Sequence, residues 1–344
     1  MSNSFESEYI ESVWKEQGIS DGSIDDVSWF LEKVKGDTYK PHKTGIPFID
    51  NLLDGGIRNQ TLTIMMAAPA TGKTTLAQQI AESIARKGRR IYYLNFEMSK
   101  EQMLAKAISA MTKIEVTDIL EGYRWTENRE KVIRAALNNY REKSLPYITY
   151  GPDWQDANLD NLLDALNQLM PYEVKDGSGP ALIVDYLHLL HSKDDLSQTI
   201  KKAVIGLKEY AVKFNTFVIA IAATNRVSND SGRITLSSGR DSSNIEYTAD
   251  LQIGMQYTKI EEAVENQKPL SKEDIKKLYS AETKEITLTL LKNRFGFPHK
   301  IATAEFTPKY NTFKGTGFSE LGTFKKERND DVPFNDGEQE EITI

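Results

Sequence analysis

One short segment constrains this chain more than any other. An apolar run from Leu62 to Ala67 is followed by a turn containing Pro69 and then by Gly72-Lys73-Thr74, which opens an amphipathic stretch. A strand, a turn and a helix in this order present backbone N–H groups to phosphate oxygens at the start of the helix. The segment therefore predicts a P-loop that binds a nucleoside triphosphate, with ATP and Mg²⁺ as the expected ligands.

The polar residues of this segment have separate expected tasks. Lys73 adds a positive charge beside the phosphates, and the Thr74 hydroxyl is expected to bind Mg²⁺. The full pattern has glycine where this chain has Ala67, a position that we expect to end the strand, where a Cβ is tolerated. An ordinary turn between a strand and a helix is the alternative interpretation. The residues expected to bind the nucleotide are Pro69, Ala70, Thr71, Gly72, Lys73, Thr74 and Thr75.

Composition limits the classes to which the chain can belong. Its 344 residues are 39% hydrophobic, which is enough for one large α/β core. The chain has no cysteine, which excludes disulfides and thiolate metal sites, and no apolar run approaches the roughly 20 residues of a membrane span. We see no N-terminal signal sequence and expect a cytoplasmic location without membrane contact.

Charge is distributed unevenly along the chain. The net charge is −7, but residues 1–40 carry nine acidic and four basic side chains, and residues 327–344 carry seven and one. The middle of the chain is therefore mildly basic, which permits contact with the phosphates of nucleic acids. An ordinary soluble surface explains the same balance equally well.

The order of the apolar runs predicts a fold class. Short strand-like runs alternate with longer helical ones, which predicts an α/β fold with a mostly parallel twisted sheet flanked by helices. The strand-like runs are 62–67, 91–95, 147–150, 181–185 and 216–222, and the helical runs are 73–87, 99–111, 127–142, 157–170 and 196–214. Later runs at 250–257, 285–293 and 300–306 predict an antiparallel extension at one edge. The charged residues 258–284 predict an exposed hairpin or a short helical insertion.

The same pattern divides the chain into three parts. Residues 1–40 combine acids with spaced apolar side chains, including Trp14 and Trp29, and predict a short helical arm that docks on its own core or on a neighbouring subunit. Residues 41–315 form the expected ATPase domain. Residues 316–344 are polar and acidic, and we expect them to form a disordered tail.

Two acidic residues follow strand-like runs. Asp185 ends the run that begins at Ala181, where a P-loop site needs a carboxylate to hold the Mg²⁺ shell. Glu97 follows the run 91–95 at the expected carboxyl end of a strand, where it could orient the water that attacks the γ-phosphate. A turn aspartate and an N-terminal charge on the next helix are the respective alternatives.

Further segments, in their order and spacing over roughly residues 40–315, resemble the RecA-like motor domain of the DnaB family of replicative helicases. The segments are Thr44-Gly45-Ile46, Ile49-Asp50, Gly55-Gly56, Asn95-Phe96-Glu97-Met98-Ser99, Val184-Asp185-Tyr186-Leu187, Val218-Ile219-Ala220-Ile221 with Asn225-Arg226, Ser242-Ser243-Asn244-Ile245-Glu246, Ala249-Asp250, Lys292-Asn293-Arg294-Phe295-Gly296 and Phe306 to Phe313. The resemblance implies a RecA-like P-loop NTPase core.

The resemblance also implies catalytic roles. In that family the glutamate of the Phe-Glu-Met-Ser segment is the catalytic base, a role that falls here on Glu97. The Lys292-Asn293-Arg294 segment resembles the one that reaches the neighbouring subunit's nucleotide, so Arg294 is the implied arginine finger, with Lys292 beside it. A charge supplied by the next subunit makes hydrolysis depend on assembly, in a ring that we expect to be a hexamer. Two solvated charges beside an edge strand are the alternative.

A motor of this kind is expected to hold single-stranded DNA by its backbone phosphates. The better candidate loop contains Arg226, Arg233 and Arg240 among small polar residues, and the segment from His191 to Lys202 is the other candidate. A plain surface loop is the alternative interpretation of both segments.

The chain departs from the family pattern in two places. Ala222-Ala223-Thr224 stands where the family usually has a glutamine after its third core strand, so Thr224 or Asn225 would have to couple hydrolysis to movement of the DNA loop. The family's large N-terminal domain, which meets primase, has no counterpart in the short arm. Such a reduced form suits a phage or mobile element, and the arm or the acidic tail is a candidate contact for replication partner proteins.

Three functions therefore compete. The leading one is an ATP-dependent, ring-shaped helicase or translocase that acts on single-stranded DNA in replication. A RecA/RadA-like recombination ATPase shares much of the same core but does not unwind DNA. A helicase-loader or regulatory ATPase without unwinding activity is the third.

Overall fold

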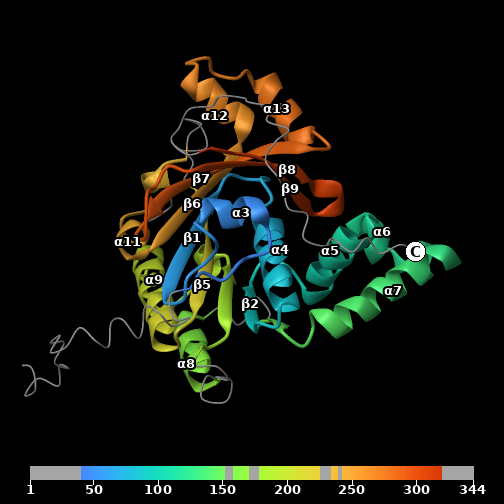
Figure 1. The fold of residues 1–344 in the computed structure, drawn as a ribbon, viewed down its shortest axis with the longest axis horizontal. Helices are drawn as coiled ribbons and strands as arrows, with labels where there is room; N and C mark the ends of the chain where they lie inside the picture. The colour runs from blue at the N-terminus through green and yellow to red at the C-terminus, as the bar shows by residue number, and fades with distance from the viewer. Residues whose placement is uncertain (1–39, 152–157, 170–177, 225–233, 239–241, 320–344) are drawn as a thin grey trace, which may run out of the picture. The chain divides into compact units, whose positions relative to one another are not determined.

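A computed structural model describes residues 40–151, 158–169, 178–224, 234–238 and 242–319 of the chain (Figure 1). Trp14, Trp29 and the predicted acidic tail beyond Ser319 lie outside the described residues. The described strands are β1 Thr61–Ala67, β2 Ile91–Asn95, β3 Ile148–Tyr150, β4 Ala181–Asp185, β5 Phe217–Ala223, β6 Leu251–Tyr257, β7 Lys284–Asn293, β8 Ile301–Thr307 and β9 Thr312–Ser319. They form one sheet in the order β3-β2-β4-β5-β1-β6-β7-β8-β9.

The sheet has a parallel part and an antiparallel part. Strands β3, β2, β4, β5, β1 and β6 are parallel neighbours, whereas β7, β8 and β9 continue the sheet in antiparallel fashion. The predicted α/β class and its antiparallel edge extension are confirmed. Strand β9 runs past residue 315, at which the sequence placed the end of the ATPase domain.

Helices cover both faces of the sheet (Figure 1). The described α-helices are α3 Pro47–Leu52, α4 Lys73–Arg86, α5 Lys100–Thr112, α6 Val116–Leu120, α7 Glu127–Lys143, α8 Leu159–Leu169, α9 Leu196–Lys213, α11 Ser242–Thr248, α12 Thr258–Glu265 and α13 Lys272–Ser280. Short 3-10 turns occur at η2 Gly122–Arg124, η5 Leu187–Leu189, η6 Leu236–Ser238 and η7 Pro308–Tyr310. Three of the long helices begin at polar caps, because the side chains of Ser99, Thr126 and Asp195 each accept a hydrogen bond from a backbone N–H three residues later.

Alternation along the strands produces two cores. In β1, Met65 and Ala67 face a cluster that includes the apolar side of α4, whereas Leu62, Ile64 and Met66 face a second cluster that includes α9. Successive strand side chains point to opposite faces, and all seven residues of β1 are buried. A strand that is buried on both faces is mostly apolar, and in β1 only Thr61 and Thr63 are polar, which is why the run before the P-loop could be recognised in the sequence.

The charged segment 258–284 forms helices and not a hairpin. Helix α13 begins at Ser271, whose hydroxyl accepts the N–H of Asp274 while the Asp274 carboxylate accepts the N–H of Ser271. Figure 1 shows α12 and α13 together beside β7 and β8. The helical insertion was therefore the correct alternative.

Strand direction defines two edges of the sheet. We call the edge at which the parallel strands end the carboxyl edge, and the opposite one the amino edge. Ala67 pairs with Ala223 and Met255 at the carboxyl edge. Because β7 is antiparallel to β6, its last residue, Asn293, pairs with Leu251 at the amino edge. Within the described residues, no helix is long and apolar enough to cross a membrane.

Candidate active site

The P-loop lies between β1 and α4 at the carboxyl edge. Ala67 is the last residue of β1, where its Cβ is accommodated, and the Thr71 hydroxyl donates to the carbonyl of Ala68 at 2.8 Å. Gly72 has a φ of +87°, and an added Cβ would lie 2.8 Å from ring carbons of both Phe306 and Phe313. Glycine is therefore required at this turn for conformational and steric reasons.

The first turn of α4 offers an anion site. No side chain caps this helix, and no acidic residue lies in its first turn, so the backbone N–H groups there remain available to a phosphate. The structure brings the predicted nucleotide-binding residues together in one loop and one helical turn. They are Pro69, Ala70, Thr71, Gly72, Lys73, Thr74 and Thr75.

A carboxylate stands beside this turn. Asp185, the last residue of β4, is fully buried, and its Oδ2 accepts a hydrogen bond from the Tyr93 hydroxyl at 3.1 Å. Burial raises the pKa of Asp185, while a hydrogen bond from the Thr74 hydroxyl and the charge of Lys73 act in the opposite direction. The Tyr93 hydroxyl was not predicted as part of the site, since nothing in its strand distinguishes it from a core aromatic.

The chemistry of these oxygens fits Mg²⁺. Oδ1 of Asp185 is buried and accepts no hydrogen bond from the described residues, although buried polar atoms are almost always paired. A hydroxyl and a carboxylate at a phosphate site are ligands that Mg²⁺ uses, together with waters and phosphate oxygens. Thr74 and Asp185 therefore remain the residues that would hold the metal, directly or through water.

Glu97 faces the P-loop lysine. Its Oε2 lies 3.8 Å from Nζ of Lys73, which also lies 4.4 Å from the centre of the Tyr186 ring. The side chain of Asn95 supports this turn, because its Oδ1 accepts the N–H groups of Glu97 and Met98, each at 3.2 Å. Helix α5 is capped by Ser99, two residues beyond Glu97, so the glutamate is not part of the first helical turn.

Lys106 is a site residue that the sequence analysis missed. Its Nζ donates to the Thr75 hydroxyl at 3.3 Å from the facing side of α5. Burial lowers the pKa of Lys106, and the negative charges of Asp185 and Glu97 partly oppose this effect. A lysine three residues after the buried Met103, on the apolar side of an amphipathic helix, was the signal that could have identified it.

Thr224 was one of the two residues expected to substitute for the family's glutamine. Its hydroxyl donates to the carbonyl of Ala67 at 3.3 Å, and the side chain is buried. The residue is therefore in direct contact with the strand that carries the P-loop. Asn225, the other candidate for this role, lies outside the described residues.

Arg294 lies at the amino edge. Its guanidinium donates to Oδ1 of Asp250 at 3.1 Å and to the carbonyl of Tyr247 at 2.7 Å. Oδ2 of the same aspartate accepts the N–H of Leu62 at 2.8 Å, near the start of β1. Because β1 rises about 3.3 Å per residue, the span from Leu62 to Ala67 alone separates Arg294 from its own P-loop by roughly 17 Å.

Lys292 is directed toward its own chain. Its ammonium donates a short hydrogen bond to the carbonyl of Glu246 in α11. Burial and the neighbouring Arg294 lower the pKa of Lys292. The structure therefore brings Lys292 together with α11, and not with the P-loop of the same chain.

The predicted DNA-binding arginines are not described. Arg226, Arg233 and Arg240 all lie outside the described residues. The alternative segment from His191 onward is described, and there Lys202 pairs with Asp194 at 2.6 Å.

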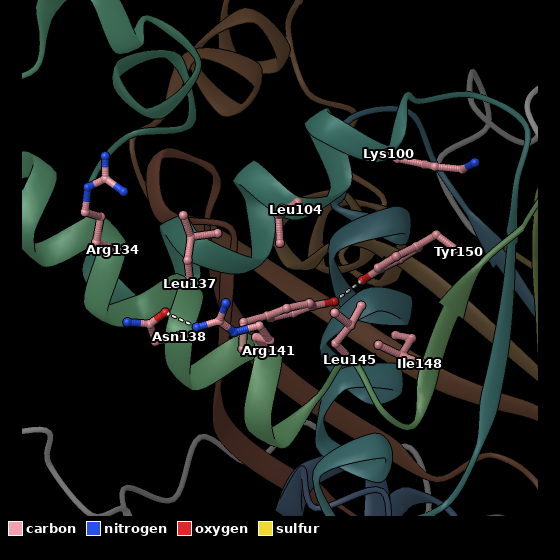
Figure 2. Close-up of a pocket in the computed structure, with 10 residues that line it drawn as sticks. Lys100, Leu104, Arg134, Leu137, Asn138, Arg141, Leu145, Ile148 and Tyr150 are labelled. Carbon is pink, nitrogen blue, oxygen red and sulfur yellow. Dashed lines mark hydrogen bonds between the residues drawn. The ribbon is translucent and has the colours of Figure 1, made fainter.

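A cavity near these elements is separate from the P-loop. A pocket of about 630 Å³ lies between α5, α7 and β3, and no residue of the P-loop lines it (Figure 2). Beneath it, the hydroxyls of Tyr140 and Tyr150 each donate to Oε1 of Glu82 at 2.8 Å. Burial raises the pKa of this carboxyl. The pocket lining consists of Lys100, Leu104, Arg134, Leu137, Asn138, Tyr140, Arg141, Leu145, Ile148 and Tyr150.

Sheet order and site chemistry define a class. A phosphate loop follows one parallel strand, and an acid ends the strand that lies two positions away across β5. This arrangement is that of a RecA-like P-loop ATPase core.

Comparison with known proteins identifies the family. Residues 42–315 match the family described as DnaB-like helicase C terminal domain, so the chain belongs to that family. Replicative DNA helicase DnaB of Haemophilus influenzae is 25% identical over 202 residues, which cover 57% of this chain and 42% of that protein. The chain therefore spans less than half the length of this relative.

Solved structures show the same fold. One solved ATPase domain superposes with a TM-score of 0.69 at 19% identity, over 87% of this chain and all of that one. A DnaB-like replicative helicase, solved in a study of its interactions with primase, gives a TM-score of 0.67 at 18% identity, over 89% of this chain and 71% of that one.

Proposed function

We propose that this chain is the ATP-hydrolysing motor of a ring-shaped DNA helicase, expected to be a hexamer, that moves on single-stranded DNA during replication. One observation carries the proposal. The phosphate-binding half of a site lies at the carboxyl edge, while Arg294 is held by Asp250 at the amino edge of the same sheet. Two such halves become one site only when the carboxyl edge of one protomer meets the amino edge of the next.

In the proposed shared site, each residue has a separate role in ATP hydrolysis. Backbone N–H groups of the P-loop and the Lys73 ammonium bind the β- and γ-phosphates. Thr74 and Asp185 would hold Mg²⁺, which when bound would neutralise charge on the phosphates. Glu97, beside Lys73, orients and deprotonates the attacking water. Arg294 of the next protomer stabilises the charge that spreads over the γ-phosphoryl oxygens.

DNA contact and biological setting extend this proposal. Arg226, Arg233 and Arg240 are proposed to hold backbone phosphates, and residues 1–40 or the acidic tail to contact partner proteins. We propose a replication role, in a phage or a mobile element, since the chain belongs to a family of replicative helicase domains. The proposal for DNA depends on the family and on the loop composition.

The test combines two inactive variants. ATP hydrolysis is measured with and without single-stranded DNA for Lys73→Ala, for Arg294→Ala and for their mixture. Each variant alone is expected to be inactive, but a mixed ring contains some interfaces with both an intact P-loop and an intact arginine, so activity should partly return. Complete absence of rescue in rings shown to contain both subunits would contradict the shared site.

Unwinding separates the proposal from its alternatives. A forked DNA substrate should be opened in an ATP-dependent reaction by a helicase. DNA-stimulated hydrolysis without unwinding would instead favour the recombination ATPase. The regulatory ATPase is favoured by one feature, the segment Ala222-Ala223-Thr224 where the family resemblance implies a glutamine, and it predicts assembly with little stimulation by DNA.

A further inference from the structure

The carbonyl of Ala70 in the P-loop accepts two hydrogen bonds from side chains of β6 and β7, the strands that flank the helical insertion. The Tyr257 hydroxyl donates to it at 3.0 Å and the Lys284 ammonium at 3.4 Å. Tyr257 ends β6 and Lys284 begins β7, so the two donors bracket the whole helical insertion of α12 and α13. The sequence analysis assigned no function to this insertion.

The two donors are buried although both are polar. Tyr257 is 1% exposed and Lys284 is 8% exposed, and Nζ of Lys284 lies 5.8 Å from the centre of the Tyr257 ring. Burial lowers the pKa of Lys284, and among the described residues no neighbouring charge contributes to this shift. A buried ammonium without a counter-charge is costly, and Lys284 donates to the P-loop carbonyl.

Helix α13 of the insertion holds the pair in place. The ring of Tyr279 packs edge-on against Tyr257, with ring centres 5.3 Å apart and planes at 77°. Tyr257 and Lys284 also line a cavity of about 460 Å³ between β7 and α13. The insertion therefore encloses the two side chains that contact the P-loop.

The geometry of the peptide bond explains why this contact matters. Ala70 has a φ of +59°, a left-handed conformation that is unfavourable for a residue with a Cβ. In a trans peptide the carbonyl of Ala70 and the N–H of Thr71 point in opposite directions. Two donors that hold the carbonyl on the insertion side therefore direct the N–H toward the opposite side of the loop.

We propose that Tyr257 and Lys284 are positioning residues for nucleotide binding, and that the insertion of α12 and α13 is the support that keeps the P-loop in its phosphate-binding conformation. Without these donors the loop loses the restraint on Ala70 and must be reordered by the nucleotide itself. The proposal depends on the proposed function only in that the P-loop binds a nucleoside triphosphate.

The experiment measures binding apart from turnover. Affinity for a fluorescent, non-hydrolysable ATP analogue with Mg²⁺ is determined for the wild-type chain, Tyr257→Phe and Lys284→Met. Each variant is expected to bind about tenfold more weakly, since each loses roughly one charge-assisted or buried hydrogen bond. At saturating ATP the hydrolysis rate should change little, so KM rises while kcat is retained. Lys284→Arg, which keeps a donor, should stay close to the wild-type affinity.

Matched controls come from the same insertion. Tyr279→Phe removes a hydroxyl from the packed tyrosine pair, and Lys277→Met removes a lysine that lines the same cavity but pairs with Glu273. Neither is expected to change the affinity. Wild-type affinity in both Tyr257→Phe and Lys284→Met would overturn the inference, and so would equal losses in the two controls.

Two further outcomes are kept distinct. If the wild-type chain does not bind the analogue, the proposed function fails, and with it the premise of this inference. Circular dichroism and thermal melting show whether Tyr257→Phe folds. If it does not fold, Lys284→Met and Lys284→Arg decide the question. Weak nucleotide binding by Lys284→Met together with near-wild-type binding by Lys284→Arg would support a role for the donated hydrogen bond, because a purely structural role would not be rescued in affinity by arginine alone.

Discussion

The two edges of the sheet differ in how much of the proposed active site each supplies within one chain. At the carboxyl edge the P-loop, Asp185, Glu97 and Lys106 approach one another and supply most of the proposed nucleotide site. At the amino edge Arg294 is held by Asp250 but contacts no residue of its own P-loop among the described residues. The difference teaches that, under the proposed function, a half-exposed charged residue can be fixed by its own chain while its reaction partner lies in the next protomer.

Contacts within its own chain fix the guanidinium of Arg294. Arg294 donates to both a carboxylate and the Tyr247 carbonyl, and Asp250 is shared with Lys208 at 2.6 Å. A guanidinium that is fixed before it meets its target loses less conformational entropy on binding. An arginine finger benefits from such preorganisation, since its effect depends on placement against a developing charge.

The comparison is tested most severely by Arg294→Ala. Hydrolysis by the assembled protein should fall by about 10³-fold or more, the effect expected of an arginine finger, while the affinity of the P-loop for nucleotide stays within about twofold. Equilibrium binding and steady-state hydrolysis, measured on the same preparation, check the two parts. Arg58→Ala is the matched control, because Arg58 lies near Phe295 at the same edge. A large loss of nucleotide binding in Arg294→Ala would break the distinction between the edges.

Asp250→Ala should have the next largest effect, this time on stability. The buried carboxylate accepts hydrogen bonds from Arg294, Lys208 and the N–H of Leu62. Its removal takes the acceptor from the buried Leu62 N–H and the counter-charge from Lys208 and Arg294. We expect the free energy of unfolding to fall by about 3 kcal/mol, measured by urea denaturation. Asp194→Ala, which breaks the exposed pair with Lys202, should change it little. Equal losses of unfolding free energy in the two variants would show that Asp250 stabilises the protein no more than an exposed ion pair does.

Lys106→Met tests whether Lys106 takes part in ATP hydrolysis at the carboxyl edge. Loss of this charge beside Thr75 should lower kcat/KM for ATP by about tenfold, the equivalent of about 1.4 kcal/mol. Because burial lowers the pKa of Lys106, the wild-type protein loses this charge at a lower pH than an ordinary lysine would. Activity that depends on it should therefore decline as the pH rises, and the variant should lack that decline. Lys100→Met, on the exposed side of α5, is the control.

The smallest effect is expected from Glu82→Gln. Glu82 lies in α4 and belongs to neither edge of the sheet. The pKa of Glu82 is raised from its ordinary value of 4.5, so the unfolded chain ionises first as the pH rises and the folded state loses stability through that interval. Glutamine does not ionise, and it can still accept from Tyr140 and Tyr150. We expect the variant to be more stable than the wild type at neutral pH, with no difference in acid. Thermal melting against pH measures this, and hydrolysis should not change.

Local patterns made much of the fold accessible from sequence. Strand β1 is mostly apolar because it is buried on both faces, and Gly72 marks the tight turn into α4, so both could be recognised from neighbouring residues. The insertion 258–284 was ambiguous, because charge alone does not separate a hairpin from two helices. Lys106 was missed because its importance depends on the distance between two helices and not on its neighbours in the chain.

The sequence by itself determined the phosphate loop, the acid at the end of β4 and the alternation of strands and helices, since each depends on residues close together in the chain. Only the tertiary structure decided that Ala70 is supported from β6 and β7, and that Arg294 lies on the opposite edge from its own P-loop. The physical reason is strand register. Asp250 reaches the backbone of Leu62 across 188 positions, and a pairing over such a separation is fixed by the packing of the whole sheet and not by any local motif.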